Sequence, residues 1–299
     1  MYYVIHAIQR NFYMDDLLAS KQSSNEATVL AKDLIEVLKT GGFRLTKWMS
    51  NSREVLTATP SSEVVCDTIH LDCNQLPQER ALGVKWCAEQ DLLSLEPVKS
   101  EFPNTKRGIL SAMSSVFDPL GIAVPYVIKG KLIIQELWRR QIDWDDELPD
   151  DILQIWRSWK ESLKSLQTIM IPRWYDFHRG QCQNVQLHVF CDASEIVYGA
   201  VAYFRAVIDG HVDVSFVVSK TRLAPIKTLT IPHLELQGAV VASRFKSKIS
   251  EEIDFEIDET HFWTDSKIVL HHLSNTQRRF STYVSHYGVI SPPKFDFRF

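Results

Sequence analysis

Three acidic residues in the last third of the chain stand where an α/β fold could bring them together. Asp192 directly follows an apolar segment with strand character, and Asp265 follows a second, shorter one and precedes a helical segment. Glu235 lies in the first turn of the long predicted helix between them. If the two strands are parallel neighbours, both aspartates emerge at the same carboxyl edge of the sheet, where open α/β sheets have their sites. A helix crossing nearby would add Glu235 to this edge.

Carboxylates gathered at one edge favour a metal-ion site. Like charges within a few Å repel one another, so they need a cation, and Mg²⁺ (with Mn²⁺ as the other possibility) prefers oxygen ligands. Two such ions about 3.5–4 Å apart can activate water and stabilise the leaving oxygen of a phosphodiester. Alternatively, each acid is an ordinary strand-end or helix-start residue, where Asp and Glu are common. All three occur in one β-β-β-α-β-α order, which favours the metal site.

That order is predicted from the hydrophobic pattern after residue 185. Three strands, a long helix, a short strand and a second helix are expected, and the fourth strand can return beside the first to give a compact α/β layout. The corresponding segments, in chain order, are 186–191, 199–204, 212–219, 234–249, 261–264 and 266–273.

The first two thirds of the chain contain a small unit followed by helices. Residues 2–20 are expected to form a strand, a tight turn and a second strand, with the first strand at Tyr2–Ile5. A capping box at Ser23 and Glu26 begins a helix that Gly41 and Gly42 end. The remaining predictions are strand-like pieces at 43–50 and 82–86, helices at 105–116, 127–140 and 150–168, and a linker at 172–183.

Composition excludes several classes of protein. The net charge of −4 argues against a protein held to nucleic acid by bulk positive charge. The sequence has no apolar run long enough to span a bilayer and no signal-peptide pattern at its start, so we expect no membrane association. Five scattered cysteines without CxxC pairs predict reduced thiols in an intracellular protein, cytoplasmic or nuclear. They are Cys66, Cys73, Cys87, Cys182 and Cys191.

Residues 185–290 resemble the ribonuclease H-like domain of LTR retrotransposons, with wording closest to the BEL/Pao group. The resemblance implies that Asp192, Glu235 and Asp265 are the catalytic, metal-binding carboxylates. The family uses a fourth aspartate further downstream, in a segment that this sequence does not match, and Asp296, the only acid after Asp265, is not expected to replace it. The matching phrases are Leu187–Ala193, Tyr198–Ala200, Ser219–Pro225, Leu229–Leu236 and Trp263–Leu270.

The rest of the chain also resembles polyproteins of the BEL/Pao group. Tyr13–Asp16 resembles the YxDD hairpin of reverse transcriptases, where a tight turn holds adjacent carboxylates against Mg²⁺. The resemblance therefore implies metal binding and catalysis for Asp15 and Asp16, although an isolated acidic pair in a turn is usually a hydrated hairpin tip. The other phrases are Phe43–Asn51, Leu82–Trp86, Thr105–Arg107, Phe117–Gly121, Gln135–Trp138 and Asp143–Asp145.

Together these matches imply four segments. They are the end of a reverse-transcriptase palm at 1–100, a helical thumb-like connection at 101–184, a truncated ribonuclease H-like domain at 185–290 and an unmatched tail at 291–299. The expected function is RNA-templated DNA synthesis with Mg²⁺-dependent cleavage of RNA in RNA–DNA hybrids, weak or absent in this fragment. The expected partners are the hybrid or a template–primer, and the remainder of a polyprotein.

The sequence leaves one other functional class open and excludes another. A non-catalytic nucleic-acid-binding or protein-binding remnant stays open, because the catalytic sets are incomplete. An aspartic peptidase requires an Asp-Thr/Ser-Gly triplet, and the sequence has none, so peptidase activity is excluded for this stretch.

Overall fold

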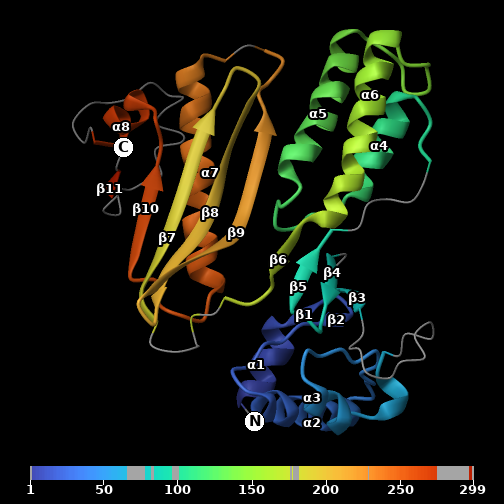
Figure 1. Cartoon of the computed structure of the whole chain (residues 1–299), viewed down its shortest axis with the longest axis vertical. Coiled ribbons are helices and arrows are strands. Elements are labelled where there is room, and N and C mark those ends of the chain that lie inside the picture. Colours follow the sequence, from blue (N-terminus) through green and yellow to red (C-terminus); the bar gives the residue numbers. More distant parts are fainter. Residues whose placement is uncertain are drawn as a thin grey trace. The chain divides into compact units, whose positions relative to one another are not determined.

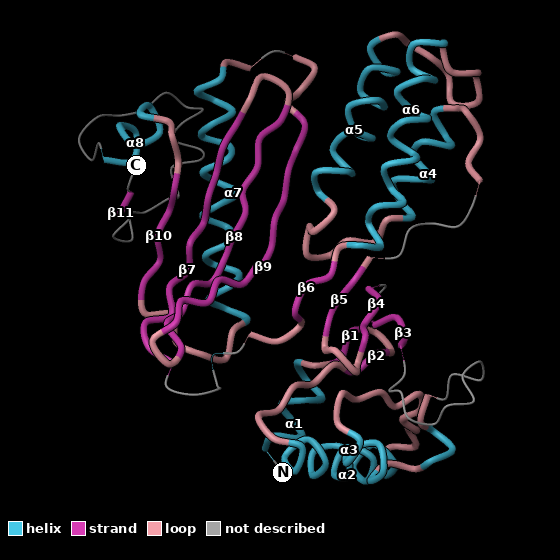
Figure 2. Tube along the Cα trace, in the orientation of Figure 1, coloured by secondary structure: helices cyan, strands magenta, loops and turns pink. Residues whose placement is uncertain are grey.

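The structure is a computed structural model that describes residues 2–65, 78–81, 84–95, 101–175, 177, 182–227, 229–274 and 296–297. The chain divides into two compact units (Figures 1 and 2). The first contains Met1–Glu96 and Thr168–Trp174, and the second contains Pro97–Gln167 and Tyr175–Phe299. Both helices and strands occur in each unit, and the fold class is α/β as predicted.

The first unit begins with a helix where a strand was expected. Tyr2–Ile5 belongs to helix α1 (Tyr2–Arg10), so the predicted strand is wrong. Val4 and Ala7, spaced for one helical face, are buried against Leu30 and Leu34 of α2 (Ser24–Thr40). A short apolar run cannot be assigned to strand or helix from its pattern alone, and the packing partner decides here. As predicted, Ser23 caps α2 by accepting a hydrogen bond from Glu26 N.

The rest of this unit contains short elements and a small sheet. A hairpin of β1 (Phe12–Tyr13) and β2 (Asp16–Leu17) follows α1, and α3 (Arg53–Ala58) and a 3₁₀ turn (Ser61–Glu63) follow α2. The predicted strand-like piece at 43–50 is wrong: these residues form no regular strand, and Trp48 makes an isolated bridge with Val64. The sheet order is β3 (Gln78–Ala81), β4 (Val84–Cys87), β5 (Leu92–Ser94) and β6 (Met170–Pro172).

Strand β6 pairs antiparallel with β5 although nearly eighty residues separate them in sequence. The residue after β6, Arg173, reinforces this pairing through a two-pronged ion pair with Asp91, with nitrogen–oxygen distances of 2.6 and 2.9 Å. Asp91 also accepts a hydrogen bond from Trp86 Nε1 at 2.9 Å. After the three helices of residues 106–162, the chain therefore returns to the first unit, which contains β6.

The second unit starts with three helices near their predicted positions. They are α4 (Lys106–Ser115), α5 (Val124–Arg139) and α6 (Asp150–Ser162), the last continued by a 3₁₀ segment (Leu163–Thr168). The turn between α4 and α5 is held by Asp118, whose carboxylate accepts hydrogen bonds from Ile122 N and Ala123 N. Gly121 completes the turn at φ +81°.

A five-stranded mixed sheet with the order β11-β10-β7-β8-β9 forms the rest of the unit. Its strands are β7 (Cys182–Ala193), β8 (Val197–Ile208), β9 (His211–Leu223), β10 (Glu259–Trp263) and β11 (Asp296–Phe297). Helix α7 (Ile231–Glu252) runs along one face of the sheet, and α8 (Lys267–Ser274) follows β10 (Figure 1). The predicted β-β-β-α-β-α order is confirmed.

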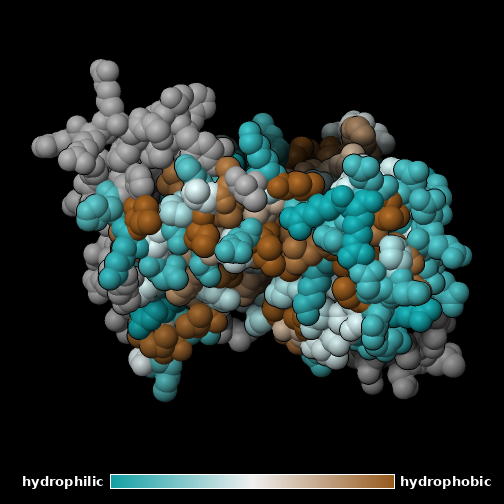
Figure 3. All heavy atoms as spheres, turned by 90° about the horizontal axis from the view of Figure 1, so that it is seen from above, coloured by the Kyte–Doolittle hydropathy of each residue, from teal (hydrophilic) through white to brown (hydrophobic). Residues whose placement is uncertain are grey.

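The core lies between α7 and the sheet. Alternate residues of β7 face α7, and Leu187 and Val189 are fully buried there beside Phe204 of β8. Elsewhere, apolar and polar side chains are interspersed on the face drawn in Figure 3. None of the helices among the described residues is both long and apolar enough to cross a membrane.

The helices of the second unit are fastened to its sheet by polar contacts. Ser219 N donates to Leu120 O at 2.8 Å, and its hydroxyl donates to Gly121 O at 2.6 Å. Gln135 of α5 donates to Ala224 O at 2.8 Å just after β9. These bonds make the helical segment and the sheet one compact unit, whereas the division of the chain into separate functional domains remains a prediction.

Candidate functional site

The two aspartates predicted to share a site lie at the same edge of the five-stranded sheet. Strand β10 pairs parallel with β7, with Trp263 opposite Phe190. Asp192 is the next-to-last residue of β7, and Asp265 lies two residues beyond the end of β10, so both lie at the carboxyl ends of these neighbouring strands. Both side chains are exposed. The sequence prediction of one common edge is therefore confirmed for this pair.

Glu235 is brought to the same edge by α7 and by a hydrogen bond. The hydroxyl of Ser266, the residue after Asp265, donates to Glu235 Oε2. One turn beyond Glu235, α7 approaches the end of β7 so closely that a Cβ on Gly238 would be 3.2 Å from Asp192 O. A Cβ contact at this distance is unusually tight, so a larger residue here would require a shift of a few tenths of an ångström. All three predicted residues thus belong to elements that meet at the end of β7.

The pKa of the Cys191 thiol is influenced by both aspartates at this edge. Its pKa is raised to about 12, mainly by burial and to a lesser extent by the negative charges of Asp192 and Asp265, while a hydrogen bond with the Thr264 side chain acts in the opposite direction. Both carboxylates therefore act on the same sulfur atom. The thiol donates to Trp263 O at 3.6 Å, which joins β7 to β10 just before the two aspartates. At this pKa Cys191 is a neutral thiol.

The carboxylate oxygens of Asp192, Glu235 and Asp265 are chemically suited to a hard cation, although the three groups do not surround a common point. Carboxylate oxygens are the preferred ligands of Mg²⁺ and Mn²⁺. However, among the residues that the structure describes, no group of three or more His, Cys, Asp or Glu side chains is arranged so that it could hold a metal ion. Asp192 Oδ1 accepts a hydrogen bond from Ala193 N at 2.7 Å, and Glu235 is bonded to Ser266. The metal-binding and catalytic roles therefore stay predictions.

The second predicted pair lies in the β1–β2 hairpin of the first unit. Tyr13 and Asp16 are directly opposite one another, and Met14 adopts φ 55° to close the turn. Asp15 and Asp16 are exposed, as is Met14 at 89%. The hairpin is as predicted, and its catalytic and metal-binding roles remain untested.

Asp296 lies outside the acidic edge. Strand β11 pairs parallel with β10, with Asp296 opposite His261, four residues before the level of Asp265. The sequence reasoning assigned no structure to this tail. Its pairing as a fifth strand is a long-range contact, which no local pattern in Asp296–Phe297 could predict.

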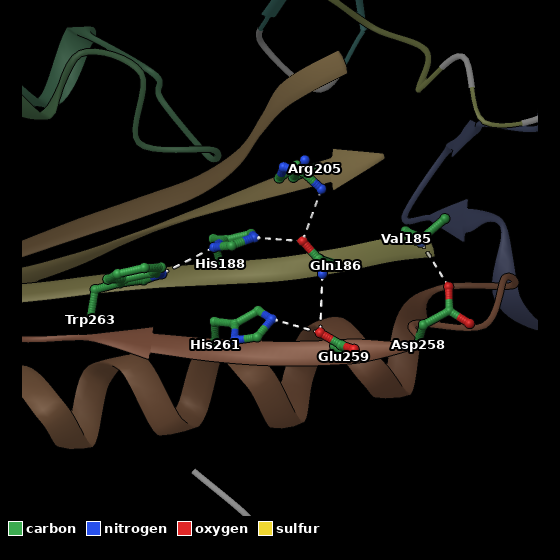
Figure 4. A network of polar contacts seen from close by, with 8 residues as sticks. All are labelled: Val185, Gln186, His188, Arg205, Asp258, Glu259, His261 and Trp263. Atoms are coloured by element: carbon green, nitrogen blue, oxygen red, sulfur yellow. Dashed lines mark hydrogen bonds and ion pairs between the residues drawn. The ribbon is translucent and has the colours of Figure 1, made fainter. Parts of the chain in front are cut away.

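A polar network that sequence reasoning missed covers the opposite face of β7 (Figure 4). Trp263 Nε1 donates to His188 Nδ1 at 3.0 Å, so this nitrogen carries no proton and His188 Nε2 donates to Gln186 Oε1 at 3.2 Å. Burial lowers the pKa of His188, and the positive charges of His261 and Arg205 lower it further, against a raising effect of Glu259.

His188 is therefore a neutral residue that links β7 to β10. Its ring stacks on that of His261 with centroids 4.9 Å apart. The only signal in the sequence is alternation: Gln186 and His188 interrupt the apolar residues of β7 at every second position.

Comparison with known proteins agrees with this fold. Residues 105–266 match the family described as Pao retrotransposon-like RNaseH-like domain. No curated protein matches the sequence.

Two solved structures of a foamy viral protease-reverse transcriptase are similar to 99% of the chain. One is a complex with double-stranded DNA (TM-score 0.53, 14% identity) and the other a complex with an RNA/DNA hybrid (TM-score 0.53, 12% identity). The chain spans 47% and 36% of the length of those proteins, and at this identity the likeness shows the fold. Because the family match covers more than half of the sequence, the chain belongs to the Pao retrotransposon RNaseH-like family, a nucleic-acid-related enzyme family.

Proposed function

We propose that the second unit is a nuclease that cleaves the RNA strand of RNA–DNA hybrids in a Mg²⁺-dependent reaction. The observation that supports this best is the parallel pairing of β7 with β10, because the carboxyl end of β7 carries Asp192 and that of β10 leads into Asp265. Glu235, hydrogen-bonded to the neighbour of Asp265, would complete the acidic set. Mn²⁺ is the expected substitute ion.

In this proposal Asp192, Glu235 and Asp265 would hold the cation, and the cation would supply an activated water. Bound Mg²⁺ would lower the pKa of water and stabilise the charge on the leaving oxygen. Asp192 would supply a ligand from the end of β7, Asp265 from just beyond β10, and Glu235 from the half-buried first turns of α7. The acidic edge would attract the cation, and the bound cation would offset the charge of the substrate phosphates.

The substrate would be recognised by its shape and its 2′-hydroxyl groups. Hybrids can be distinguished from double-stranded DNA by ribose hydroxyls that a protein contacts across the minor groove. The foamy viral protein of similar fold was solved with an RNA/DNA hybrid, which makes the same substrate class reasonable here. With a net charge of −4, the chain has little bulk attraction for phosphate, so we expect weak affinity that falls further with added salt.

The test is cleavage of a labelled RNA–DNA hybrid by the full chain with and without Mg²⁺. We expect weak, Mg²⁺-dependent cleavage of the RNA strand that Asp192→Asn reduces to the level seen without metal. Asp209→Asn is a matched control, because Asp209 lies in the β8–β9 turn at the other end of the sheet and asparagine tolerates its φ of 48°. Cleavage that survives Asp192→Asn would contradict the proposal.

For the first unit we propose a share in RNA-templated DNA synthesis, with Asp15 and Asp16 as metal ligands in a polymerase assembled with the remainder of a polyprotein. The support is the exposed acidic hairpin. Two carboxylates alone are a weak metal site, so we expect no template-dependent nucleotide incorporation by this chain alone. Incorporation in a primer-extension assay would overturn that expectation.

The second candidate is a binding module without catalysis. It is favoured by the lack of a ready three-ligand metal site among the described residues. The same experiment separates the two candidates. Hybrid binding in a mobility assay, with no cleavage in Mg²⁺ or Mn²⁺, would support the binding module.

A further inference from the structure

Ser266 connects two of the elements that meet at the acidic edge of the sheet. It lies between β10 and α8, yet its hydroxyl donates to Glu235 Oε2 in α7, 31 residues earlier in the sequence. Ser266 is only 5% exposed, so water competes little for this bond. Hydrogen bonds to a charged carboxylate are about twice as strong as neutral ones.

The orientation of this hydroxyl is fixed by a second contact. Ser266 Oγ accepts a hydrogen bond from Val269 N at 3.2 Å, which caps the start of α8. With one lone pair directed to that amide, the single hydroxyl proton is free to point to Glu235. The backbone of Ser266 is held as well, because its N–H donates to Thr264 Oγ1 at 3.2 Å.

These contacts also fix the residue between them. Asp265 is flanked by Thr264 and Ser266, and both neighbours are held by hydrogen bonds. The Ser266–Glu235 bond is then a direct link between the loop that carries Asp265 and the helix that carries Glu235. It uses one oxygen of Glu235 and leaves the carboxylate a second oxygen with which to bind a cation.

We propose that Ser266 is a positioning residue that fixes Glu235 relative to Asp265 and so sets the affinity of this edge for a divalent cation. This inference rests on the proposed nuclease function. Without the bond, the glutamate side chain regains rotamers that it must lose again when it binds the ion. Residues that hold a metal ligand in this way typically change metal affinity by about 10–100-fold when they are replaced.

The test is calorimetric titration of the full chain with Mn²⁺ alone, which needs no substrate and no turnover. We expect Ser266→Ala to weaken Mn²⁺ binding by about 10–100-fold. Ser266→Thr, which keeps the hydroxyl, should restore most of the affinity. Ser23→Ala is the matched control, because Ser23 caps α2 with the same 3.2 Å contact and lies in the other unit. It should leave the affinity unchanged.

Loss of the α8 cap is separated from loss of the Glu235 bond by a second variant. Replacing a capping serine by glycine destabilises a helix much less than replacing it by alanine. Ser266→Gly should therefore unfold near the temperature of the unaltered chain and still bind Mn²⁺ as weakly as Ser266→Ala. Equal affinity of the glycine variant and the unaltered chain would overturn the positioning role.

The controls distinguish this failure from failure of the proposed function. If Asp265→Asn abolishes Mn²⁺ binding while Ser266→Ala and Ser266→Gly do not weaken it, the metal site stands and the role of Ser266 is refuted. If the unaltered chain binds no Mn²⁺ at all, both the metal-dependent function and the inference are refuted.

Discussion

Lys106 is the most deeply buried charged side chain among the described residues, and its replacement should destabilise the second unit. It is 2% exposed, and its Nζ lies 3.0 Å from Ile142 O and 3.4 Å from the centroid of the Trp138 ring. The ring of Trp144 is 4.9 Å from the same nitrogen. The ammonium group is therefore held by two aromatic rings and a carbonyl oxygen.

The size of the effect follows from these contacts. A desolvated cation–π contact contributes about 2 kcal/mol, and a hydrogen bond from a charged donor about 1.5–3 kcal/mol. Burial of the ammonium costs several kcal/mol in the opposite direction. Lys106→Met keeps the apolar stem and removes both the contacts and the burial cost, so we expect a loss of about 2 kcal/mol or less. Lys106→Ala also loses about three buried methylenes at about 0.8 kcal/mol each, giving about 4 kcal/mol in total.

The assay is thermal unfolding followed by tryptophan fluorescence, which Trp138 and Trp144 make sensitive to this region. For a unit of this size, 1 kcal/mol shifts Tm by about 2–4 °C, so Lys106→Ala should lower Tm by about 8–16 °C. Lys129→Ala on exposed α5 surface is the control and should change stability by less than about 0.5 kcal/mol. If Lys106→Ala matches the control, the burial argument is refuted. If Lys106→Met exceeds Lys106→Ala in its cost, the order of the contributions is wrong.

Two further predictions use the described geometry. Gly121→Ala should destabilise the second unit by more than about 2 kcal/mol, because a Cβ there would lie 2.0 Å from Ser219 O at φ +81°. Gly210→Ala is the control, because Gly210 has the same φ but no atom within 4 Å of an added Cβ, so it measures the backbone cost alone. Equal Tm values for the two variants would refute the predicted clash. Because the folded-state pKa of His188 is lowered below 6.5, its contribution to stability is present above that pH and is lost as the pH falls through the lowered value. Tm should therefore fall between pH 7 and pH 5 more in the unaltered chain than in His188→Gln, and parallel pH profiles would show that His188 does not titrate there.

Local signals in the sequence were sufficient for most of the second unit. The alternation along β7 and the helical spacing of α7 depend on residues within a few positions of one another, so the element order and the common edge of Asp192 and Asp265 could be predicted. Asp118 and Gly121 likewise marked the turn between α4 and α5 by residue type alone.

Contacts between distant segments could not be predicted in this way. Strand β6 is three residues long and acquires its identity from pairing with β5. The helix at Tyr2–Arg10 depends on the buried face of α2, and an apolar run of this length fits a strand equally well. The Ser266–Glu235 bond joins residues whose types are common in helix caps and helix starts, and only the fold brings them together.

The motifs of the helical segment that resemble the family take part in contacts that the sequence alone did not predict. Arg107, beside the buried Lys106, forms a two-pronged ion pair with Asp145, and Lys106 packs on Trp138 and Trp144, so three separate phrases meet at one cluster. Two other phrases meet at Ser219, which bonds to Leu120 and Gly121. These contacts hold the helices to one another and to β9. The family match accordingly begins at residue 105, where this cluster begins, and not at the first strand of the sheet. The helical segment and the sheet therefore pack together in one compact unit.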